Sequence, residues 1–93
     1  MAQVVKTAEF EEWFQSLRDR RAQAKILSRI ERLEDGNPGD VAPVGEGISE
    51  MRIHYGPGYR VYYKTERDII ILWGGNKSTQ ATDIEKAKRL ANT

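Results

Sequence analysis

The chain of 93 residues is long enough for one domain, which we assign to residues 1–93, and too short for two. Fifteen basic and fourteen acidic residues give a formal charge of +1, which argues against the strongly basic surface of a general nucleic-acid binder. Because the sequence has no cysteine and a single histidine, disulfides, thiolate nucleophiles and cysteine-based metal sites are excluded, and we expect no metal and no other cofactor.

The first third of the chain predicts a strand and two helices. Residues 3–6 are a short β-prone run, and Thr7 is expected to cap a helix over residues 8–19. A second helix is expected over residues 20–34, ending at Gly36. Its basic surface is interpreted as solvated, or as a contact for an acidic partner or ribosomal RNA. Apolar residues at helical spacing mark the two buried faces: Phe10, Trp13, Phe14 and Leu17, then Ala22, Ile26, Ile30 and Leu33.

The middle of the chain predicts an irregular connector followed by a β-hairpin. Residues 35–47 contain four glycines, two prolines and an asparagine, so we expect little regular structure there. Polar and apolar residues alternate over 48–55 and again over 59–64, after the turn sequence Gly-Pro-Gly. This alternation is typical of two antiparallel strands that each have one buried face.

The last third predicts a buried strand, a polar loop and a helix. Residues 69–73 form a continuous apolar run, as expected for a strand covered on both faces. The run is far shorter than the roughly 18 residues of a membrane span, and the N-terminus has no apolar signal segment, so we expect a cytoplasmic protein without membrane contact. Residues 74–80 are interpreted as a loop. Thr82 and Glu85 would form a capping box if the following helix, with Ile84, Ala87, Leu90 and Ala91, starts late.

The parity of the hairpin assigns its residues to two faces. If Tyr55 lies opposite Tyr59 across a three-residue loop, Ile53 lies opposite Val61 on an apolar face that the first two helices can cover. The other face could bind a phosphodiester through arginine and stack a base on tyrosine, or it could be polar only because it is solvated. The pairs expected on this face are His54 with Arg60, Arg52 with Tyr62, and Glu50 with Lys64.

Two further residues have the chemistry for a role on phosphate. His54 could act as a general acid or base beside Arg60, or it could be an ordinary surface residue. Lys77 lies in the sequence Gly-Gly-Asn-Lys-Ser-Thr, which lacks the spacing of a P-loop. We interpret Lys77 either as a phosphate contact or as part of the connection between the last strand and the last helix.

Three segments follow one another in the second half of the chain: Glu-Met-Arg-Ile, Gly-Pro-Gly-Tyr-Arg-Val-Tyr and Gly-Gly-Asn-Lys-Ser-Thr-Gln. Together with the order of the predicted elements, they resemble the RelE/ParE toxin superfamily, and in particular the HigB-like killer proteins of type II toxin–antitoxin systems. The resemblance covers essentially the whole chain. It implies an α+β fold with the order β-α-α-β-β-β-α, in which two helices pack on one face of a small, mainly antiparallel sheet.

The resemblance also implies an activity, that of a ribosome-dependent mRNA endoribonuclease, or mRNA interferase. Such a toxin enters the A site and inhibits translation by promoting attack of a ribose 2′-OH on the adjacent phosphate. Arg60 matches the hairpin arginine of the family and would stabilise the charge of the phosphorane. Arg52 would position the phosphate and His54 could move a proton. The expected RNA-binding residues are Tyr62, Lys64 and Lys77.

The partners that the resemblance implies are a helix-turn-helix antitoxin, bound in a toxin–antitoxin heterocomplex, and the ribosome with its mRNA. Two other functions remain open at this point. A ParE-like protein would inhibit DNA gyrase by binding, and a catalytically inert module would only bind the antitoxin.

Overall fold

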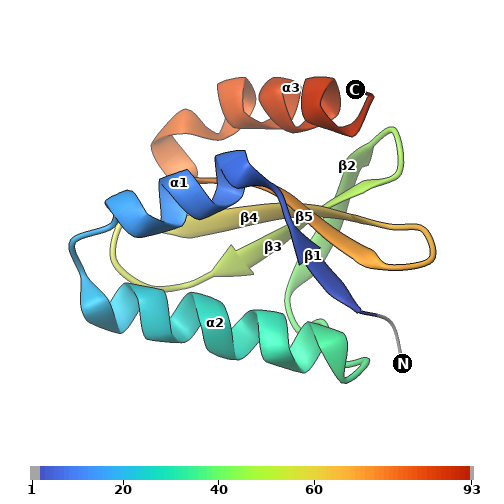
Figure 1. Ribbon diagram of the computed structural model, residues 1–93. Helices are drawn as coiled ribbons and strands as arrows, with labels where there is room; N and C mark the ends of the chain where they lie inside the picture. Colours follow the sequence, from blue (N-terminus) through green and yellow to red (C-terminus); the bar gives the residue numbers. More distant parts are fainter. Residues whose placement is uncertain (1–2, 93) are drawn as a thin grey trace.

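A five-stranded sheet with helices on both faces organises residues 3–92, which are the residues that this computed structural model describes (Figure 1). Residues 1, 2 and 93 of the domain assigned to 1–93 lie outside them. The α+β class expected from the sequence is confirmed. None of the helices within residues 3–92 has both the length and the apolar composition of a membrane span. The elements are β1 (Val4–Lys6), α1 (Ala8–Ser16), α2 (Arg20–Glu34), β2 (Val41–Gly45), β3 (Ile48–Ile53), β4 (Tyr59–Thr65), β5 (Ile69–Asn76), the 3-10 turn η1 (Lys77–Thr79) and α3 (Gln80–Ala91).

Side-chain caps set the limits of the first two helices. The Thr7 hydroxyl accepts a hydrogen bond from the Phe10 amide at 3.0 Å, so the predicted cap of α1 is confirmed. The helix ends at Ser16, three residues before the predicted end, because Leu17 is extended and the Asp19 carboxylate caps α2 instead. α2 has the predicted bounds and is followed by Gly36 at a positive φ of 87°.

The sheet has the strand order β1-β5-β4-β3-β2, in which β1 is parallel to β5 and the other neighbours are antiparallel. β2 corrects the expectation that residues 35–47 lack regular structure. It is an edge strand that pairs only with β3, and an edge tolerates Pro43, which has no amide proton to donate. The glycines and prolines of this segment are therefore compatible with a strand at the edge of the sheet.

The register of the hairpin differs from the prediction by two residues. β3 ends at Ile53, which lies opposite Tyr59, so the loop has five residues rather than three. The predicted pairs of His54 with Arg60, Arg52 with Tyr62 and Glu50 with Lys64 are therefore wrong. Both loop lengths are odd, so the assignment to the two faces is unchanged for the residues within β3 and β4, whereas His54 lies in the loop. The observed pairs are Arg52 with Arg60, Glu50 with Tyr62, and Ile48 with Lys64.

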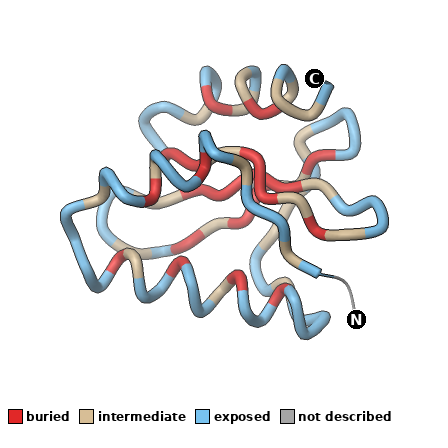
Figure 2. The backbone as a smooth tube through the Cα atoms, viewed as in Figure 1, coloured by how far each residue is buried: buried red, intermediate tan, exposed pale blue. Residues whose placement is uncertain are grey.

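Each face of the sheet has its own hydrophobic core. α1 and α2 cover one face, as predicted, and α3 covers the other, so the expectation of a solvated second face is wrong. Figure 2 shows the buried positions of α2 and α3 on the sides of these helices that face the sheet. The first core is formed by Phe10, Phe14, Ile26, Ile30, Leu33, Met51, Ile53, Val61, Tyr63, Ile69 and Ile71. The second is formed by Ile48, Tyr62, Leu72 and Ala87.

Two consecutive glycines of β5 allow both layers to approach this strand. A Cβ at Gly74 would overlap the Trp13 ring of α1, and a Cβ at Gly75 would overlap the Asp83 carboxylate of α3. The interpretation of residues 74–80 as a loop is therefore wrong, because β5 continues to Asn76 and the glycines serve close packing. The capping box is also not at Thr82 and Glu85. It is formed by Asn76 and Thr79 at η1, directly before α3.

The core of α1 generates a prediction for stability. Phe10 is fully buried, whereas Trp13 is only half-buried, in contrast to the sequence analysis, which placed both in the core. We expect Phe10→Ala to lower the free energy of unfolding by about 3–5 kcal/mol, because it leaves a cavity beneath α1. Urea denaturation followed by circular dichroism measures this change, with Leu27→Ala at an exposed position of α2 as the control. A loss at Phe10 no larger than that at Leu27 would contradict the assigned core.

Candidate functional site

A buried carboxylate is the centre of the polar residues on the α3 face. Glu50 of β3 has no exposed surface, and three side chains donate hydrogen bonds to it. Its Oε1 accepts from Arg52 Nε at 3.1 Å, and its Oε2 accepts from the Tyr62 hydroxyl at 3.0 Å and from Gln80 Nε2 at 2.7 Å. We call Glu50, Arg52, Arg60, Tyr62 and Gln80 the Glu50 cluster. It joins two strands to the first turn of α3 and satisfies a charge that would otherwise be costly to bury.

Arg60 belongs to this cluster but is only partly bonded. Its Nε lies 3.9 Å from Glu50 Oε1, which is close enough for an ion pair, yet this buried nitrogen has no hydrogen-bond acceptor among the described residues. Its Nη1 donates weakly, at 3.4 Å, to the Gly58 carbonyl oxygen. The side chain is 9% exposed, so Arg60 is not the exposed residue that the sequence analysis expected. Its charge is balanced by Glu50, but part of its donor capacity is unused.

The structure brings Lys77 next to Arg60, although 16 residues separate them along the chain. A Cβ at Gly58 would lie 3.3 Å from Lys77 Cβ and 3.6 Å from Arg60 Nη1, so both side chains pass this loop residue. Lys77 is exposed and Arg52 is 38% exposed, which makes them the accessible cations beside the nearly buried Arg60. Arg52, Arg60 and Lys77 outnumber the two carboxylates nearby, those of Glu50 and of Asp83, which lies against Gly75 beside Arg60, so this surface has an excess of positive charge.

Tyr62 and Lys64 serve the packing of α3. The Tyr62 ring is completely buried, so in this structure no face of it is open for stacking on a base. Burial, together with the hydrogen bond to Glu50, raises the pKa of the Tyr62 hydroxyl well above its usual value of 10, which keeps it neutral. Lys64 Nζ donates to the Ala91 carbonyl oxygen at 3.1 Å and pairs with Glu66. The expected RNA-binding roles of Tyr62 and Lys64 stay predictions.

His54 lies outside the Glu50 cluster, in a groove on the other side of the hairpin. This α2 groove has a volume of about 240 Å³ and is lined by Lys25, Ser28, Arg29, Arg32, Ile53, His54 and Tyr55. His54 Nε2 is 2.5 Å from the Asp40 carboxylate, and this hydrogen bond holds the pKa of Asp40 below its usual value. Arg29 is fixed nearby by bonds to the carbonyl oxygens of Arg52 and Pro38. The residues that the sequence analysis placed in one site are therefore divided between two.

The sequence analysis missed the central role of Glu50. It placed Glu50 opposite Lys64, and its two-residue error in register hid the contact with Tyr62. Gln80 was missed because no local pattern indicates that α3 returns to the β3–β4 face. The one available signal was a carboxylate followed by Met51 and Arg52 in a half-buried strand. Within residues 3–92, no group of three histidine, aspartate or glutamate side chains could hold a metal ion.

Comparisons with known proteins give a family match over most of the chain. The pattern of the family described as "Phage derived protein Gp49-like (DUF891)" matches residues 12–93. A protein of Haemophilus influenzae, described only as "Uncharacterized protein", is 50% identical over 91 residues, which are 96% of this chain and 92% of the relative. No solved structure matches the chain. The family match includes the whole Glu50 cluster and the whole α2 groove.

The burial of Glu50 predicts a large cost for removing its charge. Glu50→Gln leaves the nearly buried Arg60 guanidinium without its counter-charge, so we expect the free energy of unfolding to fall by about 3–5 kcal/mol. Urea denaturation at neutral pH measures the loss. The matched control is Glu66→Gln, which breaks an exposed ion pair with Lys64 and should cost at most about 1 kcal/mol. Equal effects of the two substitutions would show that Glu50 does not support the cluster.

The raised pKa of Tyr62 predicts a loss of stability at alkaline pH. The unfolded chain releases this proton near pH 10, whereas the folded chain keeps it, so stability is fully present below pH 10 and falls as the pH rises above that. The slope from this group is at most about 1.4 kcal/mol per pH unit. The free energy of unfolding, measured from pH 8 to pH 11, should fall less steeply in Tyr62→Phe than in the parent protein or in Tyr59→Phe. Parallel profiles of all three proteins would refute the effect.

Proposed function

This chain belongs to the phage-derived Gp49-like family, and from that membership we propose that it is the toxin of a type II toxin–antitoxin system. The family is linked to toxin–antitoxin toxins of the RelE-like kind. We propose further that the toxin is a ribosome-dependent mRNA endoribonuclease, the activity implied by the resemblance of its hairpin and of the segment around Lys77 to the RelE/ParE superfamily. Inhibition of translation would then follow from cleavage of mRNA in the A site.

One observation carries the choice of activity: two arginines face each other across β3 and β4. Arg52 and Arg60 are paired in the sheet, and Lys77 lies beside Arg60 across Gly58. Guanidinium groups donate two parallel hydrogen bonds to a phosphate, and clustered cations attract the RNA backbone. The positive charge is local, which agrees with a chain whose formal charge is only +1. A phosphate of mRNA is therefore the ligand that this surface suits best.

In the proposed reaction, the ribose 2′-oxygen attacks the adjacent phosphorus and the bond from phosphorus to the 5′-oxygen breaks. The 2′-hydroxyl loses a proton and the leaving 5′-oxygen gains one, while negative charge grows on the non-bridging oxygens. Arg60 would stabilise this charge, because β4 and Glu50 hold its guanidinium in place before the reaction. Arg52, which is more exposed, would bind and orient the phosphate. Preorganised donors of this kind contribute about 10²–10³ in rate.

The proton transfer is not assigned to a side chain of the Glu50 cluster. Tyr62 is buried and neutral, and His54 is bonded to Asp40 in the α2 groove. The proposed role of the chain at this site is therefore to position the phosphate and to stabilise charge. The ribosome and the mRNA are proposed partners, and a helix-turn-helix antitoxin is the proposed inhibitor in a heterocomplex.

The proposal is tested by inducing the protein without antitoxin and mapping the 5′ ends of cellular mRNA. We expect new ends at codon-phased positions in the parent protein, and a loss of about 10²-fold or more in Arg60→Met and Arg52→Met. Arg60→Lys should stay below the parent, because an ammonium lacks the fork of donors. Arg67→Met, at an exposed position in the β4–β5 turn, is the matched control and should cleave normally.

Circular dichroism melting of each variant separates loss of activity from loss of fold, which matters most for the nearly buried Arg60. Arg52→Met tests the phosphate site independently of Arg60, because Arg52 is 38% exposed and its substitution should disturb the fold less. Growth arrest without new mRNA ends would contradict the nuclease and favour the ParE-like gyrase inhibitor. No arrest by the folded parent protein would favour an inert module that only binds the antitoxin.

A further inference from the structure

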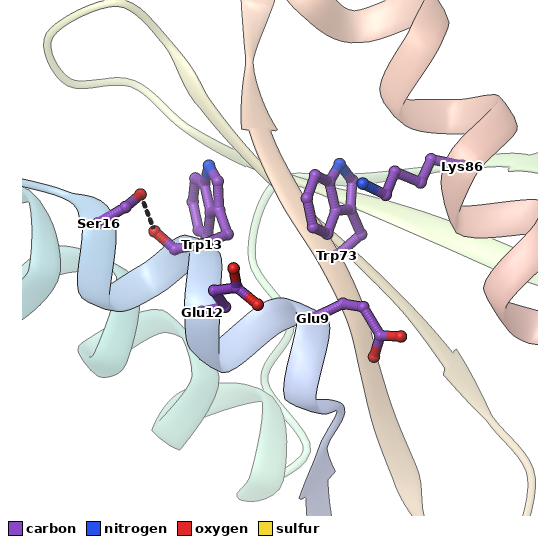
Figure 3. A pocket seen from close by; sticks show the side chains of 6 residues that line it. All are labelled: Glu9, Glu12, Trp13, Ser16, Trp73 and Lys86. Atoms are coloured by element: carbon purple, nitrogen blue, oxygen red, sulfur yellow. Dashed lines mark hydrogen bonds between the residues drawn. The ribbon is translucent and has the colours of Figure 1, made fainter.

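A slot between α1 and α3 is separate from both sites described above. It has a volume of about 290 Å³ and is lined by Glu9, Glu12, Trp13, Ser16, Trp73 and Lys86. Figure 3 shows the two indoles projecting side by side from α1 and β5, with Lys86 reaching Trp73 from α3 and both carboxylates on the α1 side. We call this site the tryptophan slot. Its volume is at the small end for ligand sites, which suits one or two side chains better than a nucleotide cofactor.

The slot forms at a place where β5 loses its outer neighbour. β1 pairs only with Ile69–Ile71, so from Trp73 onward this edge of β5 has no strand beside it. The Trp13 ring packs over this part of β5 from the α1 face, at Gly74, where no Cβ is present. The Trp73 indole is held from the α3 side, because its Nε1 donates to Asp83 at 2.9 Å. Both walls of the slot are thus fixed by packing or by a hydrogen bond.

One indole already has a cation over it and the other does not. Lys86 Nζ lies 3.7 Å from the centre of the Trp73 ring, which is a close cation–π contact. Among the described residues, no lysine or arginine lies over the Trp13 ring, and neither Glu9 nor Glu12 forms an ion pair. The slot therefore presents an indole that packs against Phe10, Tyr59 and Gly74 but has no cation over it, beside two carboxylates without an ion pair. Indole and carboxylate both attract a positive group.

Charge selects among the ligands that an aromatic slot can take. A nucleobase could stack between indoles, but its phosphates would meet Glu9 and Glu12, and two carboxylates against the single ammonium of Lys86 leave the lining negative. A purely apolar side chain would gain nothing from the carboxylates of Glu9 and Glu12, which are exposed to water. A basic side chain satisfies the indole and a carboxylate together, because its aliphatic stem packs on the ring and its head pairs with the acid.

We propose that the tryptophan slot binds an arginine or lysine side chain of a partner protein. The occupant packs against Trp13 and pairs with Glu12, next to the contact that Lys86 makes with Trp73. This site is distinct from the Glu50 cluster, so a partner can hold the chain here without touching Arg52 or Arg60. Lys86 limits the affinity, because it repels an incoming cation and covers one of the indoles.

The chain carries its own reporter for this proposal, since its only two tryptophans are the two walls of the slot. The probe is a capped peptide with one arginine between leucines, titrated against intrinsic fluorescence, and the same peptide with glutamine is its control. We expect the arginine peptide to bind at least tenfold more tightly than the glutamine peptide and to weaken as salt is raised. Binding of Glu12→Gln should be several-fold weaker. Glu11→Gln, which alters the next carboxylate on α1 outside the slot, should bind as the parent does.

Lys86→Gln gives a prediction of opposite sign. Removing the built-in ammonium should tighten binding of the arginine peptide several-fold, whereas an anionic ligand would be weakened by the same change. Trp13→Phe, with its fold checked by circular dichroism, should weaken binding and show whether Trp13 is the contact. Equal binding of the arginine and glutamine peptides, or preferential quenching by a short single-stranded RNA, would overturn the proposal. None of these readings uses toxicity, so their failure would leave the proposed function standing.

Discussion

The approach of both helical layers to Gly74 and Gly75 of β5 is the constraint on which the rest of the structure depends. Trp13 packs on the first glycine from the α1 side, and Asp83 meets the second from the α3 side. A side chain at either position would push one layer away from the sheet. Because α3 is held close, the α3 face is buried and Tyr62 and Glu50 lie in a core rather than in water.

The buried α3 face changes what its polar residues can do. On a solvated strand, Arg52 and Arg60 would be flexible and largely screened by water. Beneath α3, Glu50 accepts a hydrogen bond from Arg52 and forms an ion pair with Arg60. It also accepts a hydrogen bond from Gln80 of the helix itself. The same carboxylate that stabilises the fold therefore positions the cations of the proposed phosphate site. Stability and the proposed activity are coupled through one residue, and a substitution at Glu50 cannot separate them.

Charge is divided over the molecule into regions of different sign. The surface at Arg52 and Lys77, where we propose that RNA binds, is positive, whereas the tryptophan slot carries two carboxylates without an ion pair. The α2 groove adds a third region, in which Lys25 lies 5.3 Å from the centre of the Tyr55 ring and His54 is bonded to Asp40. A formal charge of +1 results from the cancellation of these regions and does not indicate a neutral surface.

The sequence by itself determined the bounds of α2, the cap at Thr7 and the two faces of the hairpin, because helical periodicity and strand alternation are local and survive an error in loop length. It did not determine the register, because parity is the same for loops of three and five residues. Only the tertiary structure decided that α3 covers the second face, that His54 lies apart from Arg60, and that Trp13 and Trp73 form one slot. These depend on where distant segments pack, and the periodicity of a helix shows that one face is buried without showing against what.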